Sequence, residues 1–291
     1  YGFSGGLHGV GVTVVNALSK HVLARVKRGG QTHEITYSYA VKNGPLRVVP
    51  DGKVSKNDTG TYLEFLPCEK YFDTVKVDKD KLVNLLQTKA LLCPGVKINL
   101  HDEKQEKCTT FHFENGVVGL IEEQANFAET PPNGLFHTAM DFHFDDEKTS
   151  PGHVSLWCYF TETSLLSNSF VNVIPTPQSG THVNALRSAI FDSINDYAAT
   201  HELLPKKKKF QLSTADVSST FNFVISLKIH DPDFAGQTKE RLRMPSQKSS
   251  VLSRLLKDAF VLWLNQNPNV AEAIVAMAVK KANKRLREQE K

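Results

Sequence analysis

Residues 4–11 of this 291-residue chain read SGGLHGVG and run directly into an apolar stretch at residues 12–19 that we expect to be helical. Glycines let a backbone adopt left-handed conformations and bring its amides close to a ligand. The start of the helix adds unpaired N–H groups and the positive end of the helix dipole. This junction therefore predicts an anion site, and phosphate is its natural occupant.

The common phosphate-loop patterns do not describe this junction. A Walker loop needs a Lys-Ser/Thr pair at its end, and the dinucleotide G-x-G-x-x-G follows a strand. Neither condition is met here. From spacing alone, a purely structural turn explains the loop as well as phosphate binding does.

A second segment, residues 231–242 (DPDFAGQTKERL), also carries side chains suited to phosphate. Lys239 can supply a mobile positive charge, and Gln237 a neutral hydrogen-bond donor to a terminal phosphate. A Gln-Thr-Lys triplet in a loop is also an ordinary surface turn. Both interpretations stay open on these residues alone.

The composition is that of a globular protein with more than one domain. The length exceeds what one core usually serves, and apolar residues make up 40% of the chain. No apolar run is long enough to span a bilayer, and no leader precedes the glycines, so we expect a cytoplasmic protein. The cysteines show no C-x-x-C pairing and no zinc spacing, so we expect reduced thiols and no structural metal.

The net charge is only +4, but its distribution is uneven. Residues 280–291 contain six basic residues against two glutamates, and residues 206–209 are four lysines. Such runs are usually solvated faces. Contact with a nucleic-acid backbone is the alternative.

Periodicity and turn residues predict alternating strands and helices. Strands are expected at 22–28 and 32–39 around Gly29-Gly30, at 61–66, and as a pair at 96–100 and 109–113. Residues 79–92 are expected to form an amphipathic helix. After a polar stretch at 145–152, we expect strands at 153–159, 169–174 and 221–229, and helices at 181–203, 250–265 and 270–290. The strand at 221–229 alternates in part and is expected to be half-buried.

Residues 1–19, YGFSGGLHGVGVTVVNALS, resemble the ATP-lid motif of the B subunits of bacterial type IIA topoisomerases. These belong to the GHKL superfamily of gyrase, heat-shock chaperone, histidine kinase and MutL ATPases. The resemblance implies that Gly6, Leu7, His8, Gly9, Val10 and Gly11 line the triphosphate. For the His8 side chain we favour packing beside the loop over a catalytic role. It also implies that Tyr1 contacts adenine and that Thr61, in a T-G-T motif, helps hold it.

The resemblance extends to residues 231–242, which are similar to a loop that reaches from the transducer domain of this family to the nucleotide. It implies that Gln237 and Lys239 contact the γ-phosphate. A loop held by that phosphate is released after hydrolysis, so the angle between the domains is expected to change.

Residues 169–187 are similar to the family's strand, its G-G-T-H turn and the following helix. Ser179 stands where the family has the first glycine, so the turn is altered if that position needs a positive φ. Arg187 matches an arginine that lines a cavity for DNA between paired transducers, although a solvent-facing helix arginine is the ordinary interpretation. The sequences of residues 175–178 and 258–267 resemble topoisomerase IV more than gyrase.

The family's water-polarising glutamate and Mg²⁺-binding asparagine lie on a helix upstream of the lid. Because this chain begins at Tyr1, we expect both residues upstream of it, and we expect no ATP hydrolysis by these 291 residues alone. A metal-binding domain that acts with the partner A subunit is expected downstream.

The resulting hypothesis is an α+β chain with two domains. Residues 1–144 are expected to be the later part of a Bergerat-type (GHKL) ATPase domain, and residues 145–291 a transducer of ribosomal-protein-S5-like fold. The full subunit is expected to use ATP and Mg²⁺ to dimerise with a second B subunit and to pass double-stranded DNA through a break made by the A subunit, decatenating and relaxing it. The alternatives are gyrase B, a non-catalytic nucleic-acid-binding module and a MutL-like ATPase.

Overall fold

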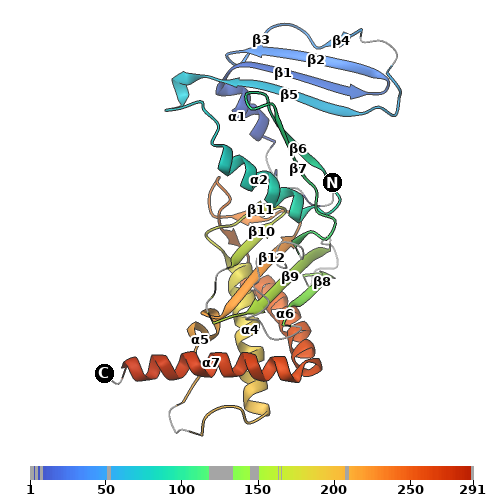
Figure 1. Ribbon diagram of the computed structural model, residues 1–291. Coiled ribbons are helices and arrows are strands. Elements are labelled where there is room, and N and C mark those ends of the chain that lie inside the picture. Colours follow the sequence, from blue (N-terminus) through green and yellow to red (C-terminus); the bar gives the residue numbers. More distant parts are fainter. Residues whose placement is uncertain are drawn as a thin grey trace. The chain divides into compact units, whose positions relative to one another are not determined.

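The chain combines helices and strands in two compact units (Figure 1). One unit comprises Gly6–Val83 and the other Asn84–Lys291 together with Tyr1–Gly5. The computed structural model describes residues 3, 6, 9–50, 54–117, 134–144, 151–162, 164, 166–206 and 210–289.

The unit of residues 6–83 is built around one antiparallel sheet. Its strands lie in the order β3-β2-β1-β5, and β4 pairs with β2. Gly29 and Gly30 have φ values of +62° and +81°, and they form the predicted hairpin between β1 and β2. The elements are α1 (Gly11–Ala17), β1 (Ser19–Arg28), β2 (Gln31–Ser38), β3 (Val41–Lys42), β4 (Arg47–Val49), β5 (Gly60–Pro67) and a 3-10 turn at Glu69–Tyr71.

An ion-pair network joins three strands of this sheet. Glu34 of β2 is 3% exposed and accepts hydrogen bonds from Arg47 of β4 and Arg25 of β1. The hydrogen bond from Arg47, with that from Arg25, lowers the pKa of the Glu34 carboxyl below its usual value. The network therefore fixes the pairing of β4 with β2.

The unit of residues 84–291 is centred on a mixed sheet in the order β11-β10-β12-β9-β8. β10 pairs with β12 in parallel, and the other pairs are antiparallel. The predicted pair at 96–100 and 109–113 is confirmed as a separate hairpin of β6 and β7. The bounds are α2 (Lys79–Leu92, which begins in the other unit), β6 (Ile98–Asp102), β7 (Lys107–Phe111), β8 (Phe136–Phe142), β9 (Gly152–Phe160), β10 (Ser167–Val171), β11 (Ile174–Pro175) and β12 (Phe221–Lys228).

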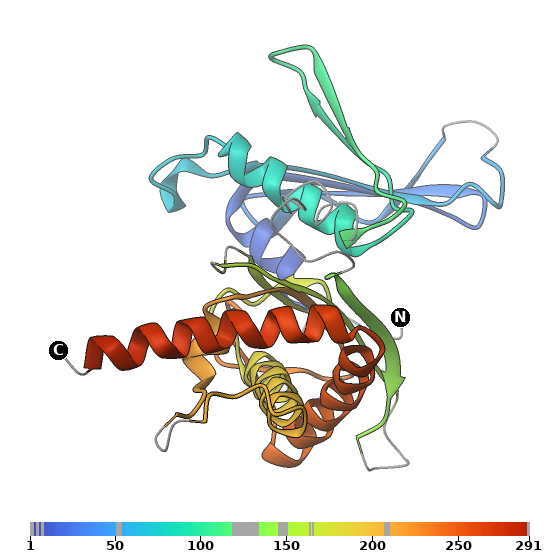
Figure 2. The same cartoon turned by 60° about the horizontal axis from the view of Figure 1, so that its bottom comes forward.

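Helices α4 (Thr181–Thr200) and α6 (Ser246–Gln266) pack together beside this sheet (Figure 1). The Phe260 ring of α6 lies 5.2 Å from that of Phe136 and 6.1 Å from that of Phe160. Helix α7 (Pro268–Gln289) contacts α4, α6 and the short α5 (Thr214–Ser218); it is the long red helix of Figure 2. The spacing of five apolar residues of α4 by three or four positions predicts one buried face, and the structure confirms it, since all five are buried: Val183, Leu186, Ile190, Ile194 and Tyr197.

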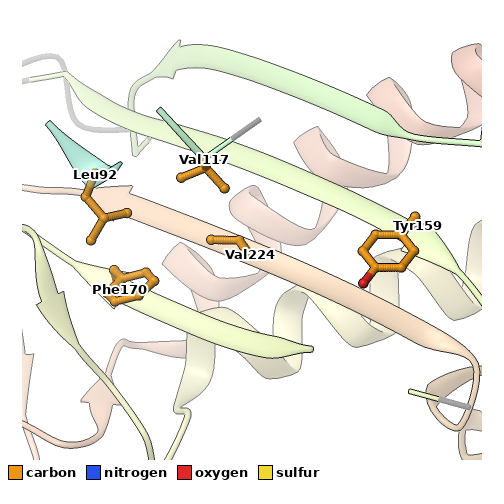
Figure 3. Packing of buried hydrophobic residues seen from close by; sticks show 5 residues of the cluster. All are labelled: Leu92, Val117, Tyr159, Phe170 and Val224. Carbon is orange, nitrogen blue, oxygen red and sulfur yellow. The ribbon is translucent and has the colours of Figure 1, made fainter. Parts of the chain in front are cut away.

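Both faces of β12 are buried, which corrects the prediction of a half-buried strand. On the face of β12 that carries Phe221, the Phe221 ring contacts Phe160, which also contacts Phe260 of α6. On the other face, Leu92 of α2 and Val117 pack with Val224 and with Phe170 and Tyr159 of the neighbouring strands (Figure 3). A central strand covered on both sides loses the polar alternation of a half-buried one.

The predicted strand at 169–174 is also interrupted. β10 ends at Val171, Asn172 and Val173 have φ values of +48° and +66°, and β11 follows as a short return strand. The Asn172 side chain donates to the Ile229 carbonyl and accepts from the Ile229 amide, both at 2.9 Å. This pair of bonds fastens the turn to the end of β12.

The division of the chain into units differs from the predicted domain boundary. The units divide at Val83 and Asn84, within α2. β8, which precedes the boundary predicted at residue 145, pairs along its length with β9 after it. The proposed domain limits therefore stay a prediction.

Two further observations concern the whole described chain. None of its described helices combines the length and apolar character needed to cross a membrane. Cys68, Cys93, Cys108 and Cys158 are free.

Phe260 and Leu262 of α6 offer a matched pair for testing the core. Phe260 is fully buried, whereas Leu262 is 60% exposed. We expect Phe260→Ala to lower the free energy of unfolding by roughly 3–5 kcal/mol through lost burial and cavity formation. Leu262→Ala is expected to change it by less than about 0.5 kcal/mol. Urea unfolding measures both, and equal effects would contradict the assigned packing.

Candidate functional site

Gln237, Thr238 and Lys239 lie at the tip of a β-hairpin rather than in the plain loop expected from the sequence. The hairpin pairs β13 (Asp233–Phe234) with β14 (Leu242–Arg243), and Ala235 N donates to Arg241 O at 2.8 Å. Gly236 and Lys239 have φ values of +98° and +59°, and Lys239 N donates to Gly236 O at 3.3 Å. Gln237 is exposed and Lys239 half-buried. The structure therefore brings both predicted phosphate contacts to one tight turn.

The base of this hairpin is anchored in the core. Phe234 is 8% exposed and Leu242 is fully buried. Across the base, Arg243 Nη2 lies 3.2 Å from Asp233 Oδ1. The chain leading into the hairpin is held by the bonds between Ile229 and Asn172. Because the base of the hairpin is buried in the core, the polar side chains at its tip are held in a fixed position.

The turn before α4 lies against this base. Gly180 precedes α4 with φ +141° and forms a parallel bridge with Leu242. A Cβ on Gly180 would lie 2.5 Å from the Leu242 carbonyl oxygen, so only glycine fits. Ser179 has φ +61°, a left-handed conformation that favours glycine, the residue that the resemblance led us to expect here.

A buried polar network lies within the same turn. Ser169 Oγ and Thr176 Oγ1 are 2.7 Å apart, and Thr176 Oγ1 is 3.3 Å from His182 Nε2. His182 is fully buried, and its Nδ1 has no hydrogen-bond partner among the described residues. Burial lowers the pKa of His182 from 6.5 to about 4. The imidazole is thus held neutral.

The described part of the glycine-rich segment is open to solvent. Gly6, Gly9, Val10 and Gly11 are exposed; Tyr1, Leu7 and His8 lie outside the described residues. Gly9 has φ +63°, and no atom lies within 4 Å of a Cβ built on Gly9 or Gly11. Val10 caps α1 without a side-chain hydrogen bond, so the first amides of the helix lack a side-chain acceptor there.

Helix α1 is shorter than predicted. It ends at Ala17 rather than at residue 19, because Ser19 already begins β1. The Ser19 hydroxyl donates to Val15 O at 2.7 Å and closes the last turn.

The remaining two predicted site residues lie on regular elements. Thr61 is exposed on β5, opposite Val26 of β1, in the same unit as the glycine-rich segment. Arg187 lies on α4, half-buried at the margin of the helix face that packs into the core. Their predicted roles with adenine and DNA stay predictions.

Sequence reasoning missed Gln178 and Glu240, which join the hairpin to the turn before α4. Their side chains are 2.5 Å apart, with Gln178 Nε2 donating to Glu240 Oε2. Gln178 lies in the family-like segment 169–187 and Glu240 in the segment 231–242, but 62 positions separate them, and neither segment indicates a contact with the other. No local signal could have paired them.

Comparison with known proteins assigns the family. The family model for DNA gyrase B matches residues 100–291. The chain belongs to the DNA gyrase B family. This DNA gyrase B family chain is 40% identical over 287 residues to the DNA topoisomerase 4 B subunit of Salmonella typhimurium, covering 99% of the chain and 44% of that relative.

Gyrase relatives are less similar. The DNA gyrase B subunit of Haloferax volcanii is 34% identical over 292 residues, covering 98% of the chain and 44% of that protein. The chain therefore spans less than half the length of these curated relatives, and its similarity to the topoisomerase IV protein is the greater.

A solved relative confirms the predicted α+β fold class. The topoisomerase IV ATP-binding domain of Francisella tularensis, solved in complex with a small-molecule inhibitor, superposes with a TM-score of 0.79 at 36% identity. The match covers 97% of this gyrase B family chain and 75% of that domain. The chain thus shares its mixed α/β fold with most of a GHKL-type ATP-binding domain.

His182 generates a prediction about acid stability. Its folded-state pKa of about 4 lies below the ordinary 6.5, so between these values the unfolded chain binds a proton that the folded chain does not. Above pH 6.5 the histidine is neutral in both states and does not reduce stability. As the pH falls to 4, protonation of the unfolded chain lowers the free energy of unfolding by on the order of 3 kcal/mol. Urea unfolding at several pH values measures this loss.

The control is a substitution of an exposed histidine. His182→Gln is expected to reduce the pH dependence of unfolding between pH 4 and 6.5, whereas His112→Gln, at an exposed position, is expected to preserve it. Equal slopes for the two variants and the unsubstituted chain would contradict the assignment.

Proposed function

We propose that this chain is the nucleotide-responsive and transducing region of an ATP-driven type II DNA topoisomerase B subunit of the topoisomerase IV type. The observation that carries the proposal is the hairpin tip at Gln237–Lys239, presented from a buried base in a chain of this family. A cation and a neutral donor on one turn suit a terminal phosphate, whose oxygens only accept hydrogen bonds. The proposed ligand is ATP.

The glycine-rich segment supports the other half of this proposal. Gly9 and Gly11 have open space where a side chain would stand, and Val10 leaves the first amides of α1 without a side-chain cap. We assign these backbone amides, with those of Gly6, Leu7 and His8, to the triphosphate, and Tyr1 and Thr61 to the adenine. ATP, when bound, would supply the free energy released by hydrolysis of its β,γ-phosphoanhydride bond.

Lys239 and Gln237 are assigned the binding of the γ-phosphate, not the activation of water. A lysine ammonium stabilises phosphate charge but cannot take a proton from water near neutral pH. The described residues contain no cluster of metal-binding side chains, so no Mg²⁺ ligand is assigned to them. In our proposal, other parts of the complete subunit activate the water and bind Mg²⁺.

DNA is the proposed second ligand. Arg187 on α4 is assigned to a passing duplex, and α7 borders a groove of about 960 Å³ whose lining includes Lys281, Lys284 and Arg287. Cations spaced along a helix can follow a phosphate backbone. The proposed partners are an A subunit and, when ATP is bound, a second B subunit, at the nucleoid.

A non-catalytic nucleic-acid-binding module is the second candidate, and the same basic groove favours it. Its lining also contains Glu162, Glu272 and Glu288, and Lys280 is paired with Glu162 at 2.8 Å. The net positive charge of the groove is therefore small. We favour the ATP-driven function because a module of this kind gives no role to the hairpin tip.

Replacement of Lys239 in the complete subunit tests the proposal. We expect Lys239→Ala to reduce ATP turnover by at least about tenfold, because the variant loses a charge-assisted contact with the γ-phosphate. Lys97→Ala, at an exposed turn of the same unit, is the matched control and is expected to keep full turnover. Phosphate release measures both variants. Unchanged turnover of a folded Lys239→Ala protein would support the binding module instead.

The assignment to topoisomerase IV rather than gyrase has its own test. The complete B subunit, reconstituted with its A subunit and ATP, is expected to unlink catenated circles and to relax supercoiled DNA. Gel electrophoresis resolves these products. Introduction of negative supercoils into relaxed circles would assign the chain to gyrase B.

A further inference from the structure

We propose that Gln178 is a positioning residue that holds the hairpin tip at Gln237–Lys239 in its phosphate-binding geometry by binding Glu240. The inference rests on the proposed γ-phosphate contact and extends it to a residue outside the hairpin. Gln178 is assigned no contact with the nucleotide; it acts through Glu240, the residue next to Lys239.

The backbones of the two segments are already joined next to the tip. Gln178 N donates to Glu240 O at 3.1 Å, and Leu242 N donates to Ser179 O at 3.3 Å. One residue further, Gly180 is packed against Leu242 with no room for a Cβ. The turn at residues 178–180 thus lies alongside the returning strand of the hairpin and sets its position.

The side-chain contact adds control of a charge. Gln178 Nε2 donates to Glu240 Oε2 at 2.5 Å. A carboxylate beside a bound triphosphate repels it and weakens its binding. The amide of Gln178 binds the Glu240 carboxylate at the turn before α4, so this negative charge is not free to swing toward the proposed contact.

The backbone of the tip needs such support. Lys239 has φ +59°, a left-handed conformation that is unfavourable for a residue with a side chain. Such conformations persist where flanking contacts determine them. Glu240 follows Lys239 directly, so its side-chain and backbone bonds to Gln178 are flanking contacts of this kind.

The test compares nucleotides with and without a γ-phosphate. In the complete B subunit, we expect Gln178→Glu to weaken binding of a β,γ-imido ATP analogue by about tenfold, because two carboxylates then face each other. ADP affinity is expected to stay within about twofold, since ADP lacks the phosphate that the tip contacts. Isothermal titration calorimetry gives both constants, and thermal melting checks that each variant is folded.

A double substitution tests the pair itself. Gln178→Glu combined with Glu240→Gln reverses donor and acceptor, and it is expected to recover analogue binding to within about threefold of the unsubstituted protein. Gln105→Glu, which adds the same charge at an exposed turn, is the control and is expected to leave both affinities unchanged.

Lys239→Ala, measured in parallel, separates the two proposals. If it lowers analogue affinity selectively while Gln178→Glu does not, the positioning role is overturned and the proposed function stands. If Lys239→Ala leaves the preference for the analogue over ADP unchanged, both proposals fail. Equal losses of analogue and ADP binding in Gln178→Glu, or no recovery in the double variant, also overturn the positioning role.

Discussion

The contact between Gly180 and Leu242 constrains the rest of the larger unit. Gly180 approaches the Leu242 backbone so closely that no side chain fits between them, and it also precedes the first residue of α4. The strand that returns from the hairpin tip and the start of a 20-residue helix therefore meet at one point. Under the proposed function, a displacement of the tip by nucleotide is passed directly to the helix that carries Arg187.

The polar network of Ser169, Thr176 and His182 adds a second constraint at the same place. Burying polar groups costs free energy unless they are hydrogen-bonded, and here each hydroxyl and one imidazole nitrogen has a partner. The network joins β10 to the segment that enters α4. It fixes one arrangement of a turn that apolar packing alone would define less well.

The two units differ in how their apolar residues are used. In the unit of residues 84–291, α6 packs on one face of the sheet and the end of α2 packs on the other. Among the described residues of the other unit, only Val22 and Cys68 are buried apolar side chains. Several apolar residues of its strand β5 are exposed, namely Tyr62, Leu63, Phe65 and Leu66.

The sequence by itself determined what depends on local chemistry. The glycines at 29 and 30 formed the expected turn, α2 has the predicted bounds, and the apolar face of α4 is buried, because turn conformations and helical periodicity are written in neighbouring residues. The family was also evident from local motifs. Only the tertiary structure decided which strand is covered on both faces, where residues 169–174 turn back, and that Gln178 meets Glu240. These features arise from contacts between distant segments, and such contacts leave no periodicity or spacing in the chain.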